Sequence, residues 1–120
     1  MAAVSIFLSF LLGLFFLATG AMKLVVPHEQ GRARIGWITD VPSSRYRAAG
    51  WLEAVGGVGL MFPTMVQAFE WLTPIAAAGL MMVMGFATRL HVMRREPRFA
   101  AGAAILVVLL ALVAISSVLA

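Results

Sequence analysis

The sequence predicts an all-α membrane protein, a bundle of four transmembrane helices with a short amphipathic or interfacial segment between the first and the second. Hydrophobic residues make up 62% of the 120 residues and charged residues only 12%, against about a quarter charged in soluble domains. The apolar residues form four stretches that are each long enough to cross a bilayer. All nine Lys and Arg residues lie in two of the three connections, within residues 23–47 and 89–98.

The first span is predicted over residues 4–22, and a helix of that length reaches roughly 28 Å, close to the hydrocarbon thickness of a bilayer. No cation precedes Lys23, and the apolar run is longer than that of a signal peptide, so we expect a span. In the connection that follows, Pro27 can begin a short helix. The arginines of this segment, Arg32 and Arg34, would stay in water, while Ile35 and Trp37 would lie in the membrane surface.

The other spans are predicted over residues 48–66, 71–88 and 99–119, within a single integral membrane domain of residues 1–120. Ser43 or Ser44 can cap the helix that becomes the second span. The short connection at residues 67–70 makes the second and third spans antiparallel neighbours. Each span should be α-helical because lipid cannot satisfy backbone hydrogen bonds. Tyr46, Trp51 and Trp71 lie near the expected interfaces, as the residues of aromatic belts do.

The distribution of cations predicts an orientation in the membrane. Positive charge is retained in the cytoplasm, so residues 23–47 and 89–98 should be cytoplasmic and both termini extracytoplasmic. The cations flank apolar spans and form no separate basic domain, so we expect them to contact anionic lipid headgroups of the bilayer and not nucleic acid. The absence of cysteine excludes disulfides and thiol chemistry. Two histidines without thiols give no recognisable metal-binding set, and no metal site is predicted.

Glu53 is an ionisable residue at membrane depth, where such groups usually face the bundle interior. At 100° per residue it shares a face with Gly50, Gly56 and Gly57, which suits a close approach between helices. Large apolar residues occupy the opposite face, which we expect to contact lipid: Trp51, Val55, Val58, Phe62 and Val66.

A candidate ligand-binding cluster is predicted at the cytoplasmic ends of three spans. It consists of Thr19, Lys23, Glu53, Thr88 and His91, which can converge in the inner leaflet. No catalytic residue is assigned within it.

Two interpretations of Glu53 stay open. As a structural residue it would form a buried ion pair with Lys23 or Arg89, or a hydrogen bond with Thr19. As a functional residue it would handle a proton or a ligand. Lys23 also fits a cation that anchors a helix end, and His91 also fits a wet residue at the interface.

Several short motifs are similar to those of a known family. Gly20-Ala-Met-Lys23-Leu24 closes the first span, and Gly50-Trp-Leu-Glu53-Ala-Val-Gly56-Gly57 lies in the second. Asp40-Val-Pro42 precedes that span, and Met82-Val-Met84-Gly-Phe-Ala87 with His91 ends the third. In order and spacing over residues 10–98, the chain resembles the DoxX-like family of small four-helix membrane proteins.

The resemblance implies a compact bundle in a bacterial inner membrane, with Lys23, Glu53 and His91 at the family's recurrent polar positions. Members of the wider group have been linked to quinone-coupled sulfur oxidation, redox-stress complexes and assistance to other membrane proteins. Relatives with cysteines support thiol chemistry, and this chain departs from them because it has none. The similar emopamil-binding proteins suggest an intramembrane pocket for a sterol-like or isoprenoid molecule.

These observations favour a protein that binds a lipid- or quinone-like molecule, or an accessory subunit of a membrane redox complex, with a homo-oligomer as a further option. The alternatives are a membrane-embedded enzyme, either a quinone-linked oxidoreductase or an isomerase that uses Glu53, and a scaffold for a larger complex. A small proton-coupled exporter is less consistent with the sequence. The small multidrug-resistance transporters carry their essential carboxylate in the first span, which has none here.

Overall fold

The computed structural model describes residues 3–25 and 43–119, and these residues form four α-helices. The helices are α1 (Ala3–Val25), α3 (Ser43–Val66), α4 (Leu72–Met93) and α5 (Pro97–Leu119). All four are long and apolar enough to cross a membrane. The predicted all-α four-helix bundle is therefore confirmed. The interfacial segment expected between the first two spans lies outside the described residues.

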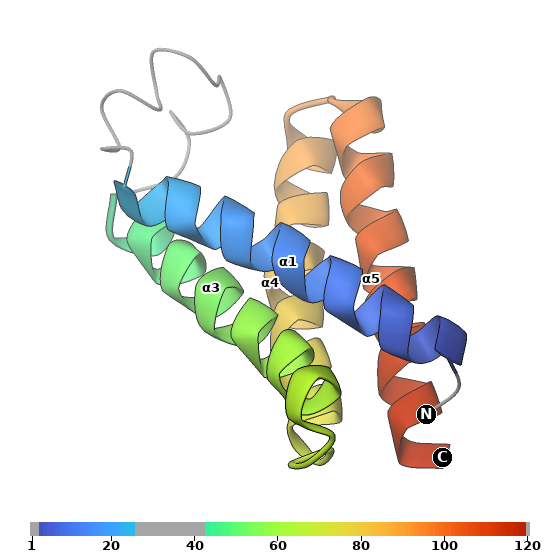
Figure 1. Ribbon diagram of the computed structural model, residues 1–120. Helices are drawn as coiled ribbons and strands as arrows, with labels where there is room; N and C mark the ends of the chain where they lie inside the picture. Colours follow the sequence, from blue (N-terminus) through green and yellow to red (C-terminus); the bar gives the residue numbers. More distant parts are fainter. Residues whose placement is uncertain (1–2, 26–42, 120) are drawn as a thin grey trace.

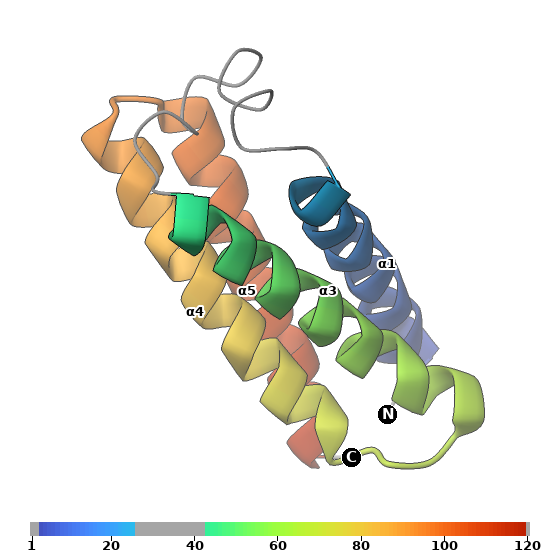
Figure 2. The same ribbon diagram turned by 90° about the vertical axis from the view of Figure 1, so that its left-hand side faces the viewer.

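The helices are arranged as two close pairs (Figure 1). Helix α1 packs along α3, and α4 packs along α5. The contact between α3 and α4 joins these two pairs, and α1 also touches α5 over a short stretch. Figure 2 shows α3 lying between α1 and α4. The α3–α4 connection, the start of α1 and the end of α5 lie at one end of the bundle, and the α4–α5 turn lies at the other.

All four helices extend beyond the predicted spans at the end that carries the cations, and α3 and α4 extend furthest. Helix α3 begins at Ser43, where the sequence predicted a cap at Ser43 or Ser44 ahead of a span from residue 48, and α4 continues to Met93, beyond the predicted end of its span at residue 88. The added residues include Arg45, Arg47 and Arg89, which are exposed. Arginine is a good helix former, so a helix can continue past the hydrocarbon while its charges stay solvated.

The core is small, and much of the apolar surface faces outward. The central cluster of buried residues draws on all four helices: Leu12, Phe16, Leu60, Ala77, Leu80, Met84, Leu110 and Val113. The side of α3 that was predicted to face lipid points outward, since Trp51 is 57% exposed and Val55 is 64% exposed. Such an arrangement suits lipid, where the surroundings of an outward apolar side chain are themselves apolar.

A tight turn joins α4 to α5 where the sequence is polar. Arg95 adopts a left-handed conformation with φ of 58°, which is a common way to end a helix. Its N–H donates to the carbonyl of Val92 over 3.1 Å, and the N–H of Glu96 donates to that of His91 over 2.8 Å. Pro97, which lacks an N–H, then begins α5.

Candidate functional site

Glycines bring the backbones of α1 and α3 into contact at two levels. A Cβ atom added to Gly20 would lie 2.6 Å from the carbonyl oxygen of Gly50, and one added to Gly57 would lie 2.5 Å from that of Gly13. Both distances are too short for a real Cβ atom, so these positions require glycine. The face of α3 that was predicted to allow close approach is the face that packs on α1.

An ion pair lies one helical turn from the Gly20–Gly50 contact. The Nζ atom of Lys23 is 2.5 Å from the Oε2 atom of Glu53, and the two side chains are 10% and 2% exposed. A Cβ atom on Gly50 would lie 3.0 Å from the Cβ atom of Lys23. The side chain of Lys23 therefore passes the bare backbone of Gly50 on its way to the carboxylate.

Two further polar side chains lie near this pair. The hydroxyl of Thr19 is close to the Glu53 carboxylate and donates to the carbonyl of Phe16 over 3.2 Å. Tyr46 lies close enough to Glu53 to interact with its charge and is only 1% exposed. The sequence placed Tyr46 at the interface, whereas the structure buries it because it shares the inward face of α3 with Glu53. Lys23, Glu53, Thr19 and Tyr46 are called the ion-pair cluster below.

The other two predicted site residues, His91 and Thr88, lie in the α4–α5 pair. The Nδ1 atom of His91 is 3.0 Å from the Oε1 atom of Glu96, and the Nε atom of Arg94 donates to the same oxygen over 2.9 Å. The Thr88 hydroxyl donates to the Met84 carbonyl over 2.8 Å. His91 is buried, and its ring lies 5.4 Å from that of Phe99.

The hydrogen bond with His91 is the main cause that lowers the pKa of Glu96, and Arg94 adds to the effect. The predicted five residues thus divide between two helix pairs at one end of the bundle. Thr19, Lys23 and Glu53 meet at the α1–α3 seam.

Sequence reasoning did not place Gly13, Gly20 or Tyr46 at the candidate site. A signal for the glycines was present, because Gly13 and Gly20 have the same seven-residue spacing as Gly50 and Gly57. Tyr46 stands seven residues before Glu53, which places it two turns away on the same helix face. Neither spacing identifies the partner helix, and that information comes only from the packing.

The ion-pair cluster can do two things chemically. An ammonium and a carboxylate in contact offer a strong donor and a strong acceptor to a polar group, and they can share a proton. Their mutual attraction is large because the surroundings are apolar. Within the described part of the chain, no three His, Cys, Asp or Glu side chains are grouped so that they could hold a metal ion.

Comparison with known proteins gives one match. The sequence model of the DoxX-like family matches residues 7–116, a range that contains all five predicted site residues. No curated protein and no solved structure matches the chain.

Proposed function

The chain belongs to the DoxX-like family of membrane proteins, and we propose that it binds a lipid- or quinone-like molecule or acts as an accessory subunit of a membrane redox complex. The buried ion pair between Lys23 and Glu53 is the observation that carries this proposal. Ionisable groups inside a membrane are costly and usually mark a functional site.

Stability alone does not account for the pair. Removing two charges from water costs several kcal/mol per ion, and well-packed apolar residues in their place are often equally stable or more so. The seam between α1 and α3 already has two glycine contacts that hold the helices together. The charges at Lys23 and Glu53 therefore need a role other than joining the two helices.

The chemistry of the pair suits the head of an amphipathic molecule. The Lys23 ammonium can donate to a quinone or ester carbonyl, and the Glu53 carboxylate can accept from a hydroxyl. Lys23 is the more exposed partner, at 10% against 2%, so it would meet the ligand first. The tail of the ligand would lie along the apolar outer surface of the helices, in the hydrocarbon.

Lipid analysis of the purified protein tests this proposal. The wild type, Glu53→Gln and Glu70→Gln would be extracted under mild conditions, and the bound lipids and quinones identified by mass spectrometry. Glu70 is a matched control because it is an exposed acidic residue at the other end of α3 and α4. We expect a molecule that is retained by the wild type and Glu70→Gln and is lost from Glu53→Gln. Equal retention by all three proteins would contradict the proposal.

A second candidate is an enzyme in which Glu53 carries a proton during quinone reduction or an isomerisation. The direct contact between Nζ of Lys23 and Oε2 of Glu53 favours it, because a proton can move along such a hydrogen bond. Turnover of a quinone or isoprenoid substrate should then show a pH profile that changes in Glu53→Gln. Turnover that is identical in this variant would remove Glu53 from the mechanism.

We further propose that the end of the bundle with the α4–α5 turn faces the cytoplasm of a bacterial inner membrane. The described cations all lie near that end: Lys23, Arg45, Arg47, Arg89, Arg94, Arg95 and Arg98. Because the chain has no cysteine, a single cysteine introduced by Arg95→Cys or by Glu70→Cys can show on which side of the membrane that position lies. A thiol reagent that cannot cross the membrane should label only position 70 in intact cells, and labelling of position 95 alone would reverse the orientation.

A further inference from the structure

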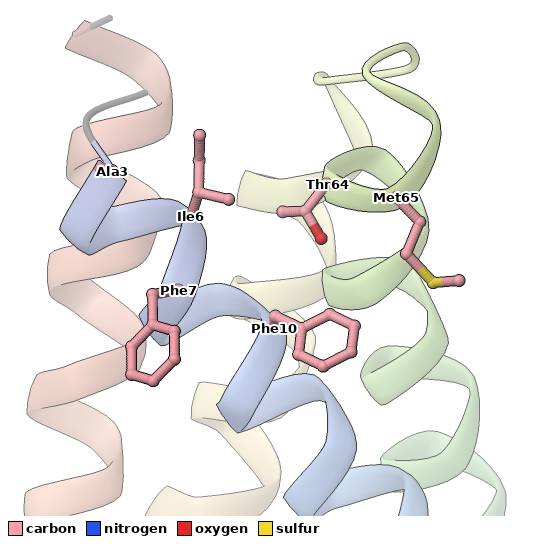
Figure 3. Close-up of a pocket in the computed structure, with 6 residues that line it drawn as sticks. All are labelled: Ala3, Ile6, Phe7, Phe10, Thr64 and Met65. Atoms are coloured by element: carbon pink, nitrogen blue, oxygen red, sulfur yellow. The ribbon is translucent and has the colours of Figure 1, made fainter.

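An apolar groove lies at the end of the α1–α3 seam that is far from the ion-pair cluster (Figure 3). It has a volume of about 420 Å³ and is open along much of its length. The lining comes from the start of α1 and the end of α3: Ala3, Ile6, Phe7, Phe10, Thr64 and Met65. Figure 3 shows Phe10 and Thr64 extending into the space between the two helices.

The groove opens where the glycine contacts stop. The last of them on α1 is Gly13 against Gly57. Between Ala3 and Gly13 the α1 residues that approach α3 carry side chains, among them Phe10. The two backbones are therefore held apart there by side chains, and these side chains line the groove between the helices.

The chemistry of the lining favours an apolar occupant. None of the described residues that line the groove is charged. The one hydroxyl among them, that of Thr64, already donates to the carbonyl of Met61 over 2.7 Å and could only accept a further hydrogen bond. A ligand group that needs to donate to or accept from several partners would bear the cost of desolvation there. The groove therefore suits hydrocarbon.

The position of the groove indicates the source of that hydrocarbon. Phe7 and Met65 at its rim are each 65% exposed, on helices whose outer faces contact lipid. The groove thus opens sideways into the bilayer, in the leaflet next to the α3–α4 connection. We propose that it binds one acyl chain of a phospholipid from that leaflet.

This chain site is independent of the ion-pair cluster. Backbone contact between Gly13 and Gly57 closes the seam between the two ends. No tail can run inside the seam from the groove to Glu53, so an acyl chain in the groove does not reach the ion pair through the seam.

Quenching of tryptophan by brominated lipid tests the proposal on the full chain in vesicles. The three tryptophans would be replaced by phenylalanine, and Phe10→Trp would place a reporter in the groove. Phe15→Trp would give a second reporter on the lipid-facing side of α1, where Phe15 is 46% exposed. Bromines on the acyl chains of phosphatidylcholine quench a tryptophan that they touch. Although position 10 is less exposed than position 15, we expect its reporter to be quenched at least as strongly.

Filling the groove provides the decisive comparison. Ala3→Phe and Thr64→Leu should each weaken the quenching at position 10 and leave that at position 15 unchanged. Ala78→Phe, at an exposed position on α4, should change neither reporter. Quenching at position 10 that is weak from the start, or that both filling variants leave unchanged, would overturn the proposal. Quenching that rises as the protein is diluted in lipid would also overturn it, because a second copy would then occupy the groove.

Discussion

Replacing Gly57 by alanine should force α1 and α3 apart, and the size of the effect can be worked out from the structure. The new Cβ atom would lie 2.5 Å from the carbonyl oxygen of Gly13 and 2.6 Å from the backbone nitrogen of Leu17. Both atoms belong to backbone, so no side chain can turn away to make room. To reach ordinary contact at 3.4 Å, the helices must separate by about 0.9 Å.

Such a separation weakens packing along the whole seam, because a gap of about 0.5–1 Å already forfeits a quarter to a half of the dispersion energy of a contact. Forcing an extra methyl group into a packed interior typically costs about 1–3 kcal/mol. Alanine also gains about 0.5–1 kcal/mol over glycine within a helix. For Gly57→Ala we therefore expect a net loss on the order of 1–2 kcal/mol in the free energy of unfolding.

Gly79 supplies the matched control, because a Cβ atom there would meet nothing within 4 Å. Gly79→Ala should be neutral or slightly stabilising. Reversible unfolding in mixed micelles, followed by circular dichroism, would measure both variants against the wild type. If Gly57→Ala proved as stable as Gly79→Ala, the reasoning about backbone contact at the seam would be wrong.

Three further predictions concern the polar side chains. Glu53→Gln and Lys23→Met should each cost about 3–5 kcal/mol in the free energy of unfolding, because each leaves a buried charge unpaired. Replacing both residues by apolar ones should cost much less than the sum of the two single replacements. Ser9→Ala should cost about 0.6–1.7 kcal/mol, because its buried hydroxyl donates to a carbonyl of α3 over 3.0 Å. Glu96 has a pKa below its ordinary value of 4.5, chiefly through its bond with His91. Its stabilising contribution is therefore complete above pH 4.5 and should be lost as the pH falls through the lowered pKa.

Each of these predictions has its own control. A double-mutant cycle separates the coupling within the ion pair from the cost of burying either partner. Ser116→Ala removes an exposed hydroxyl that bonds only within its own helix, so it should leave stability unchanged. For Glu96, unfolding measured between pH 3 and 6 should lose its acid dependence in Glu96→Gln, and an identical pH profile in both proteins would contradict the assignment.

The inward face of α3 was predictable because its reasons are local to one helix. Glu53, the small residues beside it and the large residues opposite follow the helical repeat, and each side faces the direction expected. The pairing with Lys23 was one of several options that the sequence left open. The structure selects it because Gly20 and Gly50 hold Lys23 next to the carboxylate.

His91 shows where the sequence was insufficient. Its position near the end of α4 suggested a place beside Glu53, since both lie at the same end of the bundle. The structure joins it to Glu96, which stands five residues later and comes within reach only after the chain reverses at Arg95. A left-handed turn at a non-glycine residue has no dependable signal in the sequence, so this partner could not have been named in advance.

By itself, the sequence determined that this protein is a four-helix membrane bundle with its cations at one end, because hydrophobic length and charge placement act along each segment separately. The tertiary structure alone decided that α1 packs closely on α3 and α4 on α5, where the helix backbones touch and where they leave a groove. Those features depend on contacts between residues far apart in the chain. Gly13 and Gly57, for example, form a backbone contact only because α1 lies against α3.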